Sequence, residues 1–315
     1  MKKLTKSETA EFLQTHDHYA ILSHRRPDGD TLGSTAALCR ILRNLGKTAH
    51  VVENREVTPR YSWLHEGLTK PGAEPGDTIV TVDVASPGML PAEYEQYLGA
   101  IALRIDHHGS STSFTEQELV EPEAGACGEI IYDLMMELWQ DMDKETADAL
   151  YVAVSTDTGC FRFSNTTDHS FLVAAACSRA GAEVYRLNQE IFETVRLTKL
   201  KIQSWIVENM KLFRDGKFAI VAIPKEVEES IGVTEDDMEN ISNFPRNIAG
   251  VCLAATIRGT KDGKAKLSVR ATPEYDAAAL TERFGGGGHR GAAGASISLS
   301  VEEAAKAVEK AMLEL

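Results

Sequence analysis

The sequence lacks paired cysteines, long apolar runs and an excess of positive charge. Its five cysteines include no C-x-x-C pair, which argues against a disulfide framework or a cysteine-rich zinc site and favours reduced thiols. No stretch approaches the roughly 18 consecutive apolar residues of a membrane span, and the basic first residues lead into a helical pattern instead of an apolar signal segment. We therefore expect a cytoplasmic protein that has no membrane partner.

The charge balance limits the class of ligand. The chain has 33 Lys and Arg against 47 Asp and Glu, a net charge of −14. A long polynucleotide track requires a basic groove, so we expect no long nucleic acid as partner. Metal ions can still supply local positive charge for a phosphate substrate. With 315 residues and 43% hydrophobic content the chain can form two domains. The sequence leaves the oligomeric state open, with a homodimer as one alternative because dimers are the commonest assembly.

Apolar runs alternate with helical patterns in the first half of the chain. Strand patterns occupy residues 18–24, 48–54, 77–85 and 100–108, and helical patterns occupy 31–46, 125–140 and 144–159. The alternation and the near-continuous apolar strands predict an α/β fold whose parallel sheet is covered by helices.

The second half has a different organisation. An amphipathic helical pattern covers 195–213, and it is followed by strand patterns at 214–224, 249–259 and 264–272, a Gly-rich loop and a helical pattern at 300–315. We predict three parts: an N-terminal α/β domain over 1–190, a long linker helix within 191–215, and a smaller C-terminal α/β domain over 216–315.

Acidic and histidine residues gather at the ends of the predicted strands and of one helix. They are His24, Asp28 and Asp30 in "SHRRPDGDTLGS", Asp83 in "IVTVDVA", Asp106, His107 and His108 in "LRIDHHGSS", and Asp157 in "AVSTDTGCFRF". Ligands of parallel sheets bind at the carboxyl ends of the strands. Each carboxylate alone could be a turn former or, as for Asp30, a helix cap. Four such clusters in one domain indicate a metal site.

The donor types indicate which metal. Four carboxylates would be balanced by two divalent cations, and without metal they would repel one another and raise each other's pKa values. Imidazole ligands from His24 and His107 among oxygen donors favour Mn²⁺ over Mg²⁺, with Fe, Co or Zn as alternatives.

These motifs together resemble a known family. "DHH" after a strand, with "HRRPDGD" before it and "TDTGCFRF" after it, resembles the DHH phosphoesterase family, and "FGGGGHRGAAG", Phe284 to Gly294, resembles the signature of the DHH-associated domain. The motifs extend over nearly the whole chain. Its length and lack of further domains are similar to the stand-alone NrnA-type branch, the nanoRNases that also act as 3′-phosphoadenosine 5′-phosphate (pAp) phosphatases.

The resemblance implies a role for each clustered residue. It implies two metal ions, one held by His24 and Asp28, the other by Asp30, His107 and Asp157, with Asp83 bridging both. His108 would face the substrate phosphate and, with Asp83, take part directly in catalysis. Asp106 would orient His107 from behind.

The Gly-rich motif with its histidine and two arginines are candidates for substrate binding. Successive backbone N–H groups at Gly286, Gly287 and Gly288 can form an anion site, and His289 would contact the phosphate or base. Arg270 resembles an arginine that the family places facing the substrate. For Arg162, substrate contact and a simple ion pair are equally good interpretations.

The expected function is hydrolysis of short oligoribonucleotides, such as nanoRNA and the linear dinucleotide pApA, and dephosphorylation of pAp, by metal-activated water. Three alternatives stay open: a cyclic-di-AMP phosphodiesterase, a DNA exonuclease, and a non-catalytic nucleotide sensor. The sensor is disfavoured because all six implied metal ligands are present.

Overall fold

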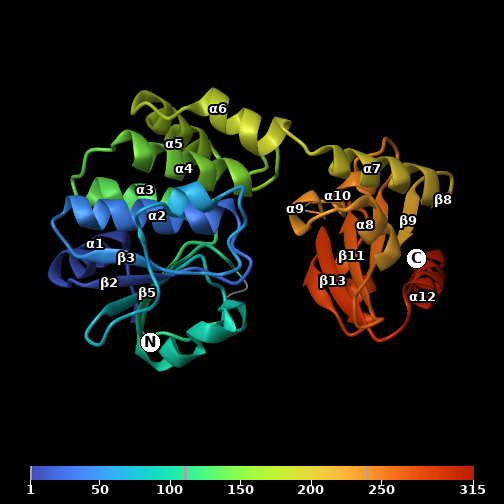
Figure 1. Ribbon diagram of the computed structural model, residues 1–315, viewed down its shortest axis with the longest axis horizontal. Helices are drawn as coiled ribbons and strands as arrows, with labels where there is room; N and C mark the ends of the chain where they lie inside the picture. Colours follow the sequence, from blue (N-terminus) through green and yellow to red (C-terminus); the bar gives the residue numbers. More distant parts are fainter. Residues whose placement is uncertain (1, 110–111, 239) are drawn as a thin grey trace. The chain divides into compact units, whose positions relative to one another are not determined.

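The computed structural model describes residues 2–109, 112–238 and 240–315 (Figure 1). The chain divides into two compact units, Met1–Thr194 and Val195–Leu315. Within the described residues, no helix is long and apolar enough to cross a membrane.

Unit 1 is built on a seven-stranded, fully parallel sheet, which confirms the predicted fold class. Its order is β1-β7-β6-β5-β2-β3-β4. The strands are β1 (Lys2–Lys3), β2 (Tyr19–Leu22), β3 (Ala49–Val52), β4 (Thr69–Lys70), β5 (Thr78–Val82), β6 (Ile101–Asp106) and β7 (Gln117–Val120). After β2 the chain adds β3 and β4 on one side and then β5 on the other. The strand order therefore reverses at β2 and β5, the point at which open parallel sheets bind ligands.

Helices cover this sheet in layers (Figure 1). The α-helices are α1 (Lys6–Thr15), α2 (Gly29–Asn44), α3 (Cys127–Glu137), α4 (Lys144–Asp157), α5 (Asp168–Arg179) and α6 (Val184–Asn188). Shorter helical segments are η1 (Ser62–His65), η2 (Pro87–Met89), η3 (Ala92–Ala100) and the π-helical η4 (Gln189–Glu193). Ile21 of β2 packs into the large core under α2 and α3, and its neighbour Leu22 packs into a second core with η3, as the period of two in a strand requires.

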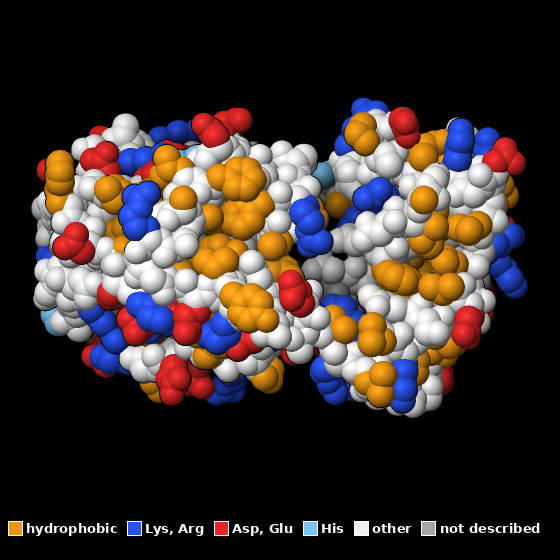
Figure 2. Space-filling model, turned by 90° about the horizontal axis from the view of Figure 1, so that it is seen from above, with side chains coloured by type: hydrophobic (Ala, Val, Ile, Leu, Met, Phe, Trp, Pro, Cys, Tyr) orange, Lys and Arg blue, Asp and Glu red, His pale blue; other side chains and the backbone are white. Residues whose placement is uncertain are grey.

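The outer helices of unit 1 are less completely buried than its sheet. Hydrophobic side chains are visible on the face seen from above (Figure 2). Phe171 and Leu172 of α5 and Tyr185 of α6 are exposed.

Unit 2 contains a six-stranded mixed sheet of order β12-β13-β11-β10-β9-β8, in which only β9 and β10 pair in parallel. Its strands are β8 (Lys211–Phe213), β9 (Phe218–Ile223), β10 (Leu253–Gly259), β11 (Ala265–Ala271), β12 (Gly287–His289) and β13 (Ala292–Ile297). Its helices are α7 (Leu197–Asn209), α8 (Lys225–Ile231), α9 (Glu235–Met238), α10 (Asn243–Arg246), α11 (Ala277–Glu282) and α12 (Val301–Leu313).

Two segments differ from the sequence-based expectation. The amphipathic pattern at 195–213 forms the shorter helix α7 and then β8, and α7 buries Ile202 and Ile206 against Val221 of unit 2. It is part of that unit and not a free linker helix, because its apolar side chains complete that core. The Gly-rich run expected as a loop forms in part the strand β12, which pairs with β13.

Candidate metal centre

The carboxyl edge of the unit 1 sheet gathers the predicted metal residues. His24 follows β2, Asp83 follows β5, and His107 and His108 follow β6. Because β2, β5 and β6 are adjacent and parallel, their ends lie side by side. The reversal of strand order between β2 and β5 leaves room there for a ligand.

Helix α2 adds two carboxylates from its first turn. Asp28 is the N-cap, and its Oδ1 accepts a hydrogen bond from the Thr31 backbone N–H at 3.1 Å. Asp30 lies inside the helix, so the structural alternative in which Asp30 is the cap is wrong. Asp30 is 1% exposed, and its carboxylate accepts hydrogen bonds from the backbone N–H groups of Cys127 (2.7 Å) and Gly128 (3.0 Å) at the start of α3. The first turns of two helices thus fix this carboxylate in place.

Asp83 has the most constrained position in the site. It is 2% exposed and has a left-handed backbone (φ 61°), which is strained for a residue other than glycine. Its Oδ2 accepts a hydrogen bond from Thr31 Oγ1 at 2.5 Å. Its buried Oδ1 has no hydrogen-bond partner among the residues that the structure describes. A buried carboxylate oxygen without a donor fits a site that binds a cation.

The two imidazoles are held with the same nitrogen facing the site. His24 Nδ1 lies 2.7 Å from the Arg25 carbonyl oxygen, and His107 Nδ1 lies 3.1 Å from the Ala124 carbonyl oxygen. A carbonyl oxygen only accepts, so each Nδ1 carries the hydrogen and each Nε2 presents a lone pair. This is the arrangement in which a histidine can bind a metal through Nε2.

Asp157 reaches the site from the last residue of α4. Helix α4 packs closely on α2 because Gly33 has no side chain: a Cβ there would lie 2.3 Å from the Ala149 carbonyl oxygen. The close approach brings Asp157 Oδ2 to 3.7 Å from His107 Nε2. Sequence reasoning placed Asp157 in the site but gave no reason for the contact, which depends on this helix crossing.

The structure brings all six implied ligands together. Asp83 Oδ2 is 3.6 Å from His24 Nε2, whereas Asp83 Oδ1 is 3.6 Å from His107 Nε2. Three groups have ligand atoms within 4.8 Å of one another: His24, Asp28 and Asp83; Asp30, His107 and Asp157; Asp83, His107 and His108. The two oxygens of Asp83 therefore face two different sets of donors.

Asp106 contacts a different histidine from the one expected. Its Oδ1 accepts a hydrogen bond from His108 Nδ1 at 2.8 Å, and the ring of His107 is oriented by the Ala124 carbonyl. The two adjacent rings lie at 60° to each other and turn to different neighbours. Asp106 also accepts the backbone N–H groups of His107 (2.9 Å) and His108 (3.2 Å), so it fixes the turn that carries both.

The carboxylates destabilise one another electrostatically. Burial, with the charge of Asp30 adding to it, raises the pKa of Asp83 well above its ordinary value. Partial burial and the charge of Asp30 raise the pKa of Asp157 to about 7. The same carboxylates would be stabilised by divalent cations, so the donor set fits metal ions.

The candidate substrate residues lie elsewhere. Arg162, in unit 1, is exposed and donates from Nε to the Gly159 carbonyl oxygen at 2.6 Å. Arg270, on β11 of unit 2, donates to Asn243 Oδ1 at 2.6 Å. Both arginines therefore already have partners within their own units.

The Gly-rich motif is explained in part by packing. A Cβ on Gly286 would lie 2.2 Å from the Gly294 carbonyl oxygen, and a Cβ on Gly288 would lie 2.6 Å from Ala293 Cα. Gly287 has open space around it, and His289 is exposed at the end of the edge strand β12. The close β12–β13 pairing thus requires two of these glycines, whatever they bind.

Sequence reasoning missed three supporting residues. Thr31 donates to Asp83, and Asn54 Nδ2 donates to the His24 carbonyl oxygen at 2.9 Å. Arg104, 1% exposed, lies on β6 just before the "DHH" motif and pairs with Glu118 at 2.8 Å. The sequence did contain an indication of Arg104's supporting role, because it is a cation inside an otherwise apolar strand pattern.

Two domain families match the chain. Residues 18–154 match the DHH family, N-terminal domain, and residues 215–314 match the DHHA1 domain. The bifunctional oligoribonuclease and PAP phosphatase NrnA of Thermus thermophilus is 28% identical over 300 residues, covering 93% of this chain and 89% of that protein. The protein of the same name from Bacillus subtilis is 27% identical over 300 residues, covering 93% of each. A crystal structure of an exopolyphosphatase-related protein from Bacteroides fragilis has the same fold, with a TM-score of 0.85 at 24% identity, covering 98% of this chain and 96% of that one.

Proposed function

This chain belongs to the DHH family and carries a DHHA1 domain, and we propose that it is a metal-dependent phosphoesterase that hydrolyses short oligoribonucleotides and dephosphorylates pAp. Both activities are part of the names of the relatives from Thermus thermophilus and Bacillus subtilis. The observation that supports the chemistry best is the position of Asp83, whose two oxygens face two separate donor sets 3.6 Å away.

Two divalent ions would be held by the six residues of the candidate site. His24 and Asp28 would bind the first ion, Asp30, His107 and Asp157 the second, and Asp83 both. Two imidazole nitrogens among oxygen donors make Mn²⁺ the best fit. When bound, such a pair of ions supplies an activated water and neutralises charge on a phosphate.

The protein groups around the site position these ligands and the substrate. The Arg25 and Ala124 carbonyls keep both Nε2 lone pairs aimed into the site. Asp106 accepts a hydrogen bond from His108 Nδ1, so His108 Nε2 can donate to a phosphate oxygen when the ring carries hydrogens on both nitrogens. His108 is also about one-third exposed, so a substrate can reach it. No serine or cysteine nucleophile is required, because the attacking oxygen comes from water.

We propose that the substrates are short. The net charge of −14 disfavours a long anionic track. The candidate contacts for such substrates are Arg162 in unit 1 and, separately in unit 2, Arg270, His289 and the N–H groups of Gly286, Gly287 and Gly288.

Product analysis tests this proposal directly. Protein stripped with chelator and reloaded with Mn²⁺ is incubated with RNA di- to pentanucleotides, pAp, pApA and cyclic di-AMP. We expect mononucleotides from the oligomers, AMP from pAp and no cleavage of the cyclic dinucleotide. Preference for cyclic di-AMP would instead identify a cyclic-dinucleotide phosphodiesterase, and binding without turnover would identify a sensor.

A pair of matched variants tests the role of Asp83. Asp83→Asn should abolish turnover, because one oxygen donor to each ion is weakened. Asp77→Asn changes a carboxylate just before the opposite end of the same strand and should retain activity. Near-normal turnover of Asp83→Asn with full metal content would refute the bridging role.

A further inference from the structure

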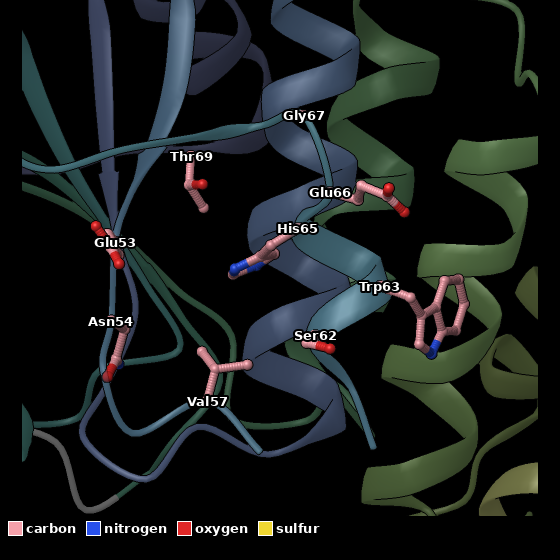
Figure 3. Close-up of a pocket in the computed structure, with 9 residues that line it drawn as sticks. All are labelled: Glu53, Asn54, Val57, Ser62, Trp63, His65, Glu66, Gly67 and Thr69. Atoms are coloured by element: carbon pink, nitrogen blue, oxygen red, sulfur yellow. The ribbon is translucent and has the colours of Figure 1, made fainter. Parts of the chain in front are cut away.

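Unit 1 contains a cavity that has no role in the chemistry described above. Its volume is about 500 Å³, and it lies between η1 and the segment that follows β3 (Figure 3). His65 reaches into it from η1, Glu53 and Asn54 form the opposite wall, and Val57 adds an apolar surface (Figure 3). It is therefore a concave site with a few polar groups, the usual form of a small-molecule pocket.

His65 presents a hydrogen-bond acceptor to this cavity. The side chain is buried (5% exposed), and its Nε2 lies 3.2 Å from the Leu32 carbonyl oxygen and 2.9 Å from Thr35 Oγ1. The Thr35 hydroxyl donates to the Thr31 carbonyl oxygen at 2.8 Å. Both neighbours of Nε2 can thus accept, so Nε2 carries the hydrogen and Nδ1 is a lone pair. Nδ1 has no hydrogen-bond partner in the described part of the chain, and burial, which lowers the pKa of His65 to about 4, keeps the ring neutral.

Glu53 presents a second acceptor. It directly follows β3 and is exposed, and the described residues offer its carboxylate no hydrogen bond or ion pair. A carboxylate and an imidazole lone pair both require N–H donors from a ligand and repel carbonyl and phosphate oxygens.

The pocket adjoins the metal centre. Strand β3 pairs directly with β2, the strand that ends before His24, so the residues that follow these two strands are neighbours at one edge of the sheet. Asn54 joins them: its Nδ2 donates to Ser23 Oγ at 3.0 Å and to the His24 carbonyl oxygen at 2.9 Å. A ligand whose phosphate lies at the metal centre can therefore extend into the pocket.

We propose that this pocket binds the nucleobase of the nucleotide whose phosphate is at the metal centre, and that it favours bases with an amino group over uracil. The inference rests on the proposed function and adds a base preference to it. Adenine, cytosine and guanine each offer an exocyclic N–H₂ to Glu53 and His65. Uracil offers only one N–H, and the carbonyl oxygens on either side of it would face the two acceptors of the pocket, Glu53 and His65.

The experiment compares how fast the protein cleaves dinucleotides with different bases. The kcat/KM values of Mn²⁺-loaded protein are measured on the dinucleotides pApA, pCpC, pGpG and pUpU, and each is divided by the value for pUpU. Because the ratio is formed within one variant, the folded fraction cancels. We expect the wild-type protein to favour the three amino bases by about tenfold, the effect of one or two buried hydrogen bonds left unmade.

Two substitutions should remove the preference. His65→Gln keeps an N–H donor toward Thr35 but loses the Nδ1 acceptor, and Glu53→Gln replaces one acceptor oxygen by a donor. The double variant should show ratios within about twofold of one. Glu74→Gln is the matched control: Glu74 is exposed and is not among the residues that line the cavity, so its ratios should equal those of the wild-type protein.

The outcomes separate the two proposals. Equal rates on all four dinucleotides, or an unchanged ratio in the double variant, would overturn the base pocket and leave the proposed function standing. Failure of the wild-type protein to cleave any dinucleotide would overturn the proposed function and the pocket with it.

Discussion

Substitution of Arg104 should change the free energy of unfolding and the affinity for metal for two separate reasons. Its guanidinium is buried, and Nη2 donates to Glu118 Oε2 at 2.8 Å. Glu118 is itself 3% exposed. Arg104→Met preserves most of the side-chain volume but leaves the Glu118 carboxylate buried without its cation. Breaking a buried pair on one side costs about 3–5 kcal/mol, whereas replacing both members by apolar residues is often neutral.

Replacing Arg104 should also affect the two loops that carry the metal ligands. Arg104 Nη1 donates to the carbonyl oxygens of Ala85 and Thr112, both at 3.2 Å. Ala85 follows Asp83 by two residues, and Thr112 follows the "DHH" turn. Arg104 therefore ties together the two segments that present Asp83 and the histidines. Loss of such support beneath ligands lowers metal affinity by about 10–100-fold.

The assay uses urea unfolding with chelator present, followed by Mn²⁺ titration of the folded variants. We expect Arg104→Met to lose about 3–5 kcal/mol, and the double variant Arg104→Met/Glu118→Leu to recover only part of it, because Asp106 Oδ2 lies 3.8 Å from Arg104 Nη1 and also loses its cation. The double variant should still bind Mn²⁺ weakly. Arg258→Met is the matched control, because Arg258 pairs with the buried Glu228 at 2.7 Å in unit 2 and should not change Mn²⁺ affinity. A loss below about 1 kcal/mol in the single variant, or normal Mn²⁺ affinity in the double variant, would refute the reasoning.

Three further predictions concern metal, acid and substrate. Chelator-stripped protein should be inactive and should recover better with Mn²⁺ than with Mg²⁺; full recovery with Mg²⁺ alone would count against His24 and His107 as ligands. Burial lowers the pKa of His65 from 6.5 to about 4, so as the pH falls the unfolded chain takes up a proton at this histidine before the folded protein does. The folded state is therefore favoured by up to about 3 kcal/mol above pH 6.5, and this stability should be lost as the pH falls toward 4. Urea unfolding of His65→Gln in chelator should lack this part of the pH dependence, and an unchanged pH slope would contradict it. His289→Ala should lower kcat/KM on a dinucleotide by about ten- to a hundredfold, but much less on bis-p-nitrophenyl phosphate, with unchanged metal content; equal losses on both would instead place His289 in the chemical step.

The sequence alone determined the parallel sheet of unit 1 and the residues at its carboxyl edge. Apolar strand patterns that end in His24, Asp83 and His107 carry this information locally, because a strand and its last residue are consecutive in the chain. Parallel pairing then requires those ends to lie at one edge. The presence of the four carboxylates also follows from the sequence, whereas their pKa values depend on burial and on the packing that brings them together.

Tertiary structure decided which atoms meet. The Ala124 carbonyl that orients His107 lies 17 residues along the chain, and the crossing of α2 and α4 at Gly33 places Asp157. Asp106 contacts His108 instead of His107, whose ring is held by the remote Ala124 carbonyl. The predicted linker helix belongs to unit 2, because its apolar side chains pack against strands that are remote in sequence. The pocket beside His65 also depends on tertiary structure: its walls come from the segment after β3, from η1 and from the start of β4, and no local pattern specifies where these segments meet.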